Sequence, residues 1–498
     1  MDCCTTRMRA NWLPSLPELF FMALLFWLFA AGDGWSALLA DGDTGWHIRN
    51  GERILACHCI PRWDPFALGT AGHPWFAWEW LSDVLFACLH GLAGLKAIVF
   101  ATGVIVAATF SIMLRHCLWL GANPFLALPV ALLTTGASSL HFLARPHILS
   151  LLLLVVCAWA LDCDRRKTTP WVWTLPLMTA LWCNLHGGFL IVFPMLAGAF
   201  LEACCASPRR ARRYAGLTLL CVAATGINPY GWQLHRHVLS YLQSDWIFNS
   251  IQEFQSPQFR SEGLHQFEVL LGMGLVLIPT LLRGRQWAGC VLLLFWGHEA
   301  LNAVRHVPIY CLTAAPYITM ALEALGRHGV AAGLRRPWEM LRRVGVEWKT
   351  WAAGVSPAPA LVCAIFFFVP IGHPWPIDFP SSKFPTAMVN RNWELLGSAA
   401  VRPLPIFSSD QWSDYLIYRR YPQVRVYFDG RSDFFAGWRG PAYSRLLQGS
   451  PGCAEILKQA GFDWALVPAD WPLAGLLAAQ PDWTTVDRDP QAILFRRL

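Results

Sequence analysis

Two aspartates separated by one residue open the segment Asp41-Gly-Asp-Thr-Gly-Trp-His-Ile-Arg-Asn50. The segment follows the first long apolar run, so its charged groups lie at the edge of a membrane, where uncompensated charge is costly and usually functional. On an extended chain Asp41 and Asp43 point to the same side. They could share a divalent cation such as Mg²⁺ or Mn²⁺, or one could hold a substrate while the other acts as general base.

Further candidates for chemistry lie in later outer loops or at outer helix ends. An arginine there can grip a phosphate with two hydrogen bonds, although it could equally extend its charge to the interface and anchor the helix. We assign phosphate binding to Arg145, Arg305, His306 and His147, and contact with other parts of a substrate to Trp46, His47, Arg49, His186 and Glu253. His186, in Asn184-x-His186-Gly-Gly188, also fits a tight turn between two helices.

The composition indicates an α-helical polytopic membrane protein. Of 498 residues 55% are hydrophobic and 14% are charged, with a mean hydropathy of +0.38. A spanning helix needs about 20 mostly apolar residues. This criterion predicts about eleven spans, at residues 16–38, 94–114, 123–142, 147–163, 170–185, 188–206, 213–228, 265–282, 286–302, 305–325 and 351–371.

The basic residues predict the orientation. They fall in alternate loops, which places the N-terminus in the cytoplasm and the C-terminus outside. The clusters are Arg7 with Arg9, Arg115, residues 165–167, residues 209–213, Arg283 with Arg285, and residues 327–349. Since no basic face forms, the net charge of +7 does not indicate nucleic-acid binding.

The outer side should carry two long loops, 41–93 and 228–263, and a soluble α/β domain at 372–498, with the membrane domain at 1–371. In the first loop we expect interfacial helices at 47–55 and 75–92. In the soluble domain we expect strands at 406–407, 424–428, 464–467 and 492–495. The turn at 427–433 could bind an acceptor, but an Asp–Arg pair that holds the loop is the simpler interpretation. Cys57 and Cys59 lack a second pair for zinc.

The pattern Asp41-x-Asp43-x-x-Trp46-His47-x-Arg49, in a chain with this topology, resembles the GT-C superfamily of integral-membrane glycosyltransferases. That superfamily includes oligosaccharyltransferase catalytic subunits, protein O-mannosyltransferases and lipid A aminoarabinose transferases. The segment from Gly72-His-Pro-Trp75 to Glu79-Trp-Leu81 is similar to the second acidic position of the aminoarabinose branch, although the Lys-Pro that follows there is absent. The resemblance implies Asp43, or Asp41, as catalytic base and Glu79 as a second acidic group.

The predicted function is therefore transfer of a sugar, with inversion, from a polyprenyl-phosphate donor to a glycan, lipid or protein acceptor on the extracytoplasmic face of the membrane. The alternative is a transporter or flippase of lipid-linked sugars without transfer chemistry. A transporter would be expected to show internal repeats and polar or broken helices near the bilayer midplane. Here the candidate polar residues gather at one face instead.

Overall fold

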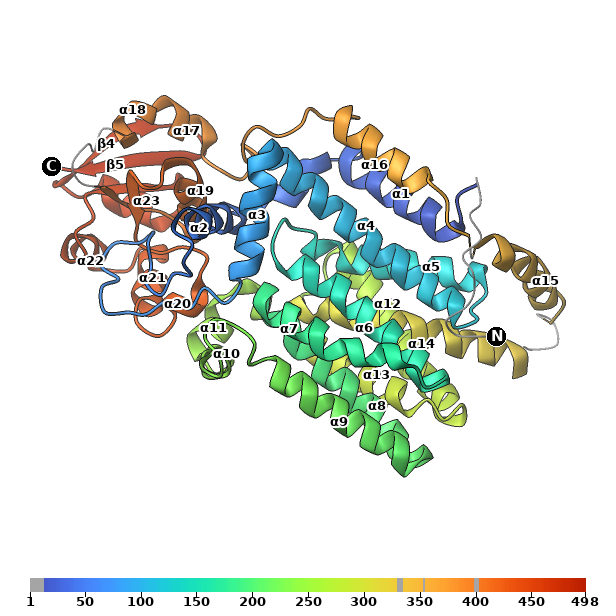
Figure 1. Ribbon diagram of the computed structural model, residues 1–498. Helices are drawn as coiled ribbons and strands as arrows, with labels where there is room; N and C mark the ends of the chain where they lie inside the picture. Colours follow the sequence, from blue (N-terminus) through green and yellow to red (C-terminus); the bar gives the residue numbers. More distant parts are fainter. Residues whose placement is uncertain (1–12, 329–334, 353, 398–402) are drawn as a thin grey trace.

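The computed structural model describes residues 13–328, 335–352, 354–397 and 403–498. A bundle of long helices makes up most of the chain, and a unit built on a five-stranded sheet lies at one end of it (Figure 1). Short helices from the outer loops lie between the bundle and the sheet (Figure 1). The helical membrane protein with a small C-terminal α/β unit is thereby confirmed.

Within the described ranges, six helical segments are long and apolar enough to cross a membrane. They are α4 (Leu95–Trp119), α5 (Pro124–Ser138) with η2 (Ser139–His141), α6 (His147–Arg166), η4 (Gly187–Ile191) with α8 (Val192–Ala206), α12 (Glu262–Arg283), and η6 (Val304–His306) with α14 (Val307–His328). The other predicted spans coincide with shorter helices: α1 (Leu16–Ala30), α7 (Leu175–Leu185) after η3 (Pro170–Thr174), α9 (Pro208–Ala224), α13 (Trp287–Asn302) and α16 (Ala358–Phe368). The count of eleven spans stays a prediction.

The first predicted span, 16–38, is not one helix. Helix α1 ends at Ala30, and a separate 3-10 turn, η1 (Gly34–Leu39), follows it. Gly32 and Gly34 adopt φ of +55° and +57°, a left-handed backbone that stops the α-helix. The chain then enters the first outer loop at Asp41.

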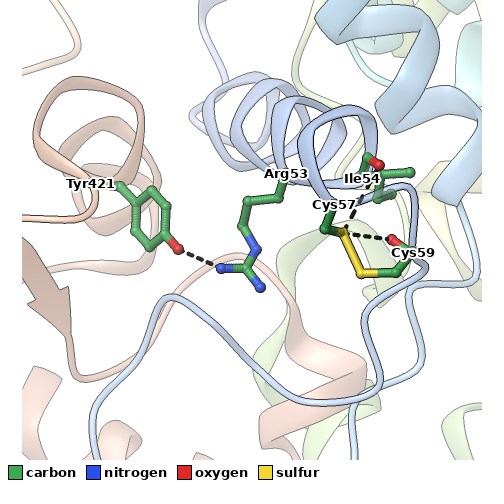
Figure 2. The surroundings of a disulfide bond; sticks show 5 residues. All are labelled: Arg53, Ile54, Cys57, Cys59 and Tyr421. Atoms are coloured by element: carbon green, nitrogen blue, oxygen red, sulfur yellow. Dashed lines mark hydrogen bonds between the residues drawn. A yellow bond between two sulfur atoms is a disulfide. The ribbon is translucent and has the colours of Figure 1, made fainter.

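Both helices expected in that loop are present, as α2 (Asp43–Cys57) and α3 (Trp80–Ala93). Helix α2 begins four residues earlier than predicted and α3 five residues later, and their place in the membrane interface stays a prediction. The Asp41 side chain accepts a hydrogen bond from the Asp43 N–H at 2.9 Å, at the start of α2. The helix ends where a disulfide joins Cys57 to Cys59, beside the hydrogen bond from Arg53 to Tyr421 (Figure 2). The second outer loop forms α10 (Gln233–Leu242), α11 (Asp245–Ser250) and η5 (Gln252–Phe254).

The C-terminal sheet has strand order β2-β1-β3-β5-β4. Strands β1 (Leu404–Phe407), β2 (Val424–Val426) and β3 (Trp464–Pro468) are parallel, and β5 (Ala492–Arg497) and β4 (Trp483–Arg488) continue the sheet in antiparallel pairing. The four predicted strands are present. Strand β4 was not predicted, because this edge strand is largely exposed and polar after Trp483. The helices around the sheet are α17 (Thr386–Arg391), α18 (Trp393–Gly397), α19 (Asp410–Arg420), α20 (Ser432–Phe435), α21 (Gly440–Leu447), α22 (Cys453–Gln459) and α23 (Pro472–Ala478).

The first outer loop is built into this C-terminal unit. Its backbone pairs with the free edge of β2, where the Val426 N–H donates to Phe66 and the Leu68 N–H donates to Val426. Arg431 adds a buried ion pair, with its guanidinium 2.7 Å from Asp64 of the loop and 2.5 Å from Asp429. The simpler interpretation of residues 427–433, an Asp–Arg pair that holds the loop, therefore describes the observed contacts.

The opposite end of the bundle carries the basic residues and α15 (Arg335–Ala352), far from the sheet (Figure 1). Contacts tie these residues to that end: Arg115 donates to Gly354, and Arg166 donates to Leu120. Arg165 is buried there between Asp162 and Glu202. Arg7 and Arg9 lie outside the described residues. The described clusters gather at one end, as the predicted topology requires.

Replacing Arg431 with methionine should lower the free energy of unfolding by about 3–5 kcal/mol, because Asp64 and Asp429 would stay buried without a cation. The measurement is thermal or denaturant unfolding of the whole protein in detergent. Arg488→Met, at an exposed position of β4, is the control and should behave as wild type. Equal stability of the two variants would show that Arg431 does not hold the loop to the C-terminal unit.

Candidate active site

Arg145 lies at the centre of a group of acidic side chains, in the turn that precedes α6. Its guanidinium is 3.0 Å from Asp41 and 2.7 Å from Asp43, in two separate contacts. A third carboxylate, Glu253 of the second outer loop, is 3.8 Å away. Three segments far apart in the sequence therefore meet at one cation, and Arg145 does not extend to the interface as a lone anchor.

A second arginine stands on the other side of Glu253. The Arg305 guanidinium is 3.5 Å from Glu253, donates to the Tyr241 hydroxyl at 3.2 Å, and lies over the Phe254 ring. Burial would raise the pKa of Glu253, but Arg305 and Arg145 outweigh it and lower that pKa to about 2. Glu253 thus remains ionised and links the two arginines.

Glu79 forms a second acidic position, at the residue that precedes α3. Its carboxylate lies 3.7 Å from the His47 ring and 3.5 Å from His186. The Nδ1 of His186 accepts a hydrogen bond from the Gly188 N–H, so its Nε2 can carry the proton toward Glu79. The tight turn between two helices is therefore present, and the ring of His186 lies beside Glu79. Contact of His186 with a substrate stays a prediction.

Burial sets the acid–base properties of this region. Burial and the neighbouring Asp41 raise the pKa of Asp43 to about 7, against the opposing effect of Arg145. Burial, with Asp83 nearby, raises the pKa of Glu79 well above its ordinary value. Burial lowers the pKa of His47 well below its ordinary value, so that ring is neutral. Asp43 is thus poised near neutrality, as a general base requires.

Some predicted residues lie apart from this cluster. Arg49 is six residues beyond Asp43 on a helix, which places it on a different face of α2. It binds the Tyr418 backbone and Glu52 instead, a structural role in the contact with α19. His147 donates to the His141 backbone and His306 to the Glu299 backbone. Trp46 is buried against the His47 ring.

The structure adds residues that the sequence reasoning missed. Asp83 of α3 lies 2.5 Å from His47 and accepts from Asn50, and Asp433 lies 3.0 Å from His237 of α10. Asp414 of α19 reaches Asp43. Asp83 stands within an apolar helical pattern, which is a signal that could have identified it. Asp414 and Asp433 carry no such signal, because only the packing of the C-terminal unit brings them to the first loop.

The arrangement of Asp41 and Asp43 does not suit a divalent cation. Arg145 bonds to one oxygen of Asp41 and to one of Asp43, so it occupies the position between them that a shared cation would need. Among the described residues no group of three or more His, Cys, Asp or Glu side chains is arranged to hold a metal ion. As arranged here, Asp41 and Asp43 fit a guanidinium better than Mg²⁺ or Mn²⁺, which prefer several oxygen ligands.

No family model and no curated protein sequence matches this chain. Solved structures do resemble it. The archaeal oligosaccharyltransferase AglB from Archaeoglobus fulgidus, in complex with an inhibitory peptide and a dolichol-phosphate, aligns over 91% of this chain and 69% of its own, with a TM-score of 0.54 and 11% identity. The arabinofuranosyltransferase AftD from mycobacteria aligns over 98% of this chain, with a TM-score of 0.51 and 14% identity.

This chain covers 42% of the AftD chain. ArnT from Cupriavidus metallidurans aligns over 96% of this chain and 95% of its own, with a TM-score of 0.47 and 11% identity. The likenesses to AglB and AftD show that this chain shares their fold.

We expect the wild-type protein to bind no Mn²⁺ at this cluster, because Arg145 already neutralises the carboxylates. Arg145→Ala should create a weak Mn²⁺ site from Asp41, Asp43 and Glu253. Electron paramagnetic resonance of added Mn²⁺ measures the binding of the ion to wild type and to Arg145→Ala. Arg62→Ala, which removes an exposed guanidinium bonded to the Pro229 backbone, is the control and should match wild type. Mn²⁺ binding by wild type that is lost in Asp41→Asn would support a shared cation instead.

Proposed function

We propose that this protein is a glycosyltransferase that moves a sugar from a polyprenyl-phosphate donor to a hydroxyl acceptor, with inversion and with Asp43 as general base. In this reaction the acceptor oxygen bonds to the anomeric carbon and the bond from that carbon to the phosphate oxygen breaks. The acceptor proton passes to Asp43, and the phosphate leaves on its lipid. The acceptor is a glycan, a lipid or a protein.

One observation carries the proposal: a buried carboxylate with a pKa of about 7 lies beside a fixed cation at the end of a GT-C membrane bundle. The side chain of Asp43 is only 6% exposed. A carboxylate in such a place is costly to retain without a task. The bond from Arg145 leaves one oxygen of Asp43 without a hydrogen-bond donor, so a lone pair remains available for a proton.

The donor phosphate needs positive charge as its bond to the sugar breaks. Arg305 is suitable, because its guanidinium is a quarter exposed and a single carboxylate, Glu253, lies within ion-pair distance of it in the described part of the chain. Arg145 is already engaged by two aspartates. The ring N–H groups of His147 and His306 are bound to backbone carbonyls, so Arg305 is the proposed phosphate ligand. The membrane lipids around the bundle give a polyprenyl carrier lateral access to this end.

The active face is proposed to lie outside the cytoplasm. Two features support this orientation: the basic residues at the opposite end of the bundle, and the disulfide between Cys57 and Cys59 in the first outer loop (Figure 2). Disulfides persist in oxidising compartments and are rare in the cytosol. The loop, the candidate site and the C-terminal unit lie at the same end of the bundle (Figure 1).

Asp43→Asn should reduce sugar transfer by roughly a hundred to ten thousand fold, the usual effect of removing a general base. Donor binding should survive, because the carrier phosphate is held elsewhere. The measurement is transfer of radiolabelled sugar from purified polyprenyl-phosphate lipids in liposomes, with donor binding followed in parallel. Asp33→Asn, outside the cluster, is the control.

Near-normal transfer in both Asp43→Asn and Asp41→Asn would remove the catalytic role of this segment. If the wild-type protein moved the lipid-linked sugar between leaflets without transferring the sugar, it would be a flippase instead.

Arg305→Lys should weaken donor binding, because lysine keeps the charge but loses the planar pair of N–H donors that matches a phosphate. Arg305→Ala should weaken it further. Both are measured by equilibrium binding of a polyprenyl monophosphate, with Arg260→Ala in the second outer loop as control. Unchanged binding in both Arg305 variants would assign Arg305 to a structural role with Glu253.

A further inference from the structure

Asp43 has two different neighbours, one for each carboxylate oxygen. One oxygen bonds to Arg145 at 2.7 Å, and the other has no hydrogen-bond donor among the groups described. The second oxygen faces the C-terminal unit, where the Asp414 carboxyl is within hydrogen-bonding reach. Two carboxylates therefore meet across the contact between α2 and α19.

We propose that Asp414 is a positioning residue of the active site, which shares a single proton with Asp43 across this contact and so fixes the direction and charge of the base. The inference rests on the proposed function in assigning Asp43 as the base. The shared proton itself follows from geometry. Two ionised carboxylates cannot face one another in a buried space, and a proton between them turns repulsion into a hydrogen bond.

The backbone is shaped to bring the two acids together. A Cβ on Gly430 would lie 1.9 Å from the nearer Asp43 oxygen and 2.7 Å from Asp414, so only glycine leaves room for the pair. The Gly430 N–H donates to both oxygens of Asp414 at 3.1 Å and holds that carboxyl in place. On the other side, a Cβ on Gly45 would lie 2.6 Å from the Asp414 backbone oxygen, which shows how closely α2 and α19 approach.

The charged groups around Asp43 and Asp414 determine which positive charge can lie between the two carboxylates. Asp43 is faced by Arg145, Asp41, Glu253 and, more weakly, Glu79; Asp414 is faced by Asp429, Asp410 and the Gly430 N–H. Arg431 bonds to Asp429 and Asp64, so it is already engaged. In the described part of the chain, no cationic side chain forms an ion pair with Asp414. A proton is therefore the positive charge that fits between Asp414 and Asp43.

The pair suits a general base. With one proton between them, the two acids carry a single negative charge and can accept one more proton, the one released by the acceptor hydroxyl. The arrangement also makes the base depend on the C-terminal unit, because half of the pair belongs to α19. Separation of α19 from α2 would leave Asp43 facing Arg145 and the acids of the outer loops, without the shared proton.

The first test is the pH profile of transfer by wild type, Asp414→Asn and Tyr421→Phe. An asparagine keeps the shape and the bond from Gly430 but cannot hold the shared proton or a like charge. Burial raises the pKa of Asp43, and the hydrogen bond from Asp414 lowers it. Loss of the shared proton in Asp414→Asn should therefore move the acid limb to higher pH than in wild type. Tyr421→Phe removes the bond from Arg53 to the C-terminal unit, so it controls for weaker docking. Its acid limb should stay at the wild-type pH.

An unmoved acid limb in Asp414→Asn, or an equal movement in Tyr421→Phe, would reduce Asp414 to a docking residue. A second readout needs no activity. The pKa of Asp43 is raised from 3.8 to about 7, so the folded state holds a proton that the unfolded state releases between those values. Stability from this group is therefore present at low pH and lost as pH rises through about 7.

The melting temperature of wild type should accordingly fall between about pH 5 and pH 8, and Asp414→Asn should lose much of that fall. The difference between the melting-temperature curves of wild type and Asp414→Asn reports the Asp43–Asp414 pair, because the other titrating groups are common to both proteins. If wild type transfers no sugar at any pH, the proposed function fails, but the melting curves still show whether the two acids share a proton. Parallel curves for wild type and Asp414→Asn would overturn the shared proton whatever the activity.

Discussion

The guanidinium of Arg145 compensates the acids that the first two outer loops bring to the end of the membrane bundle. Three carboxylates lie within 4 Å of it, and each would be strongly disfavoured there alone. At an effective dielectric constant of about 20, one pair at 4 Å gains on the order of 4 kcal/mol. That gain is needed because burial disfavours the charged forms of Arg145, Asp43 and Glu253. Arg145 therefore joins α6 and both outer loops at one point.

The need to cover the buried carboxylates of the first outer loop also explains why the C-terminal unit packs against that loop. Helix α2 presents its acidic N-terminus to the bundle and packs one face on α19, where glycines allow the two backbones to approach. The pairing of loop one with β2 and the buried Arg431 then close the first loop onto the sheet. The loop is thus held from both sides, and its carboxylates are covered by protein. That cover, more than the sequence of the loop, raises the pKa of Asp43.

Much of this arrangement could be predicted from local sequence. Apolar run length predicts helices, and the alternation of basic residues predicts which ends lie together, because both depend on the bilayer alone. That Asp41, Asp43, Arg145 and Glu253 lie at the same end of the bundle could be predicted, because each falls in an outer loop or at the outer end of a helix. Their pairing could not, since it depends on the path of loops between helices. The face of α2 on which Arg49 lies could not be predicted either, because it depends on the start of the helix at Asp43.

Asp414 marks the limit of such reasoning. It stands in α19, a helix without an amphipathic pattern that is buried along most of its length, and nothing in its neighbours within the sequence sets it apart from Asp410. Only the docking of α19 on α2 buries it against a second acid. In the proposed function, the helical bundle supplies the cation and the lipid access, and a base at the end of the bundle alone would be exposed to water. The C-terminal unit covers the proposed base, Asp43, with a partner acid, so the ionisation of Asp43 would depend on contact between two parts of the chain.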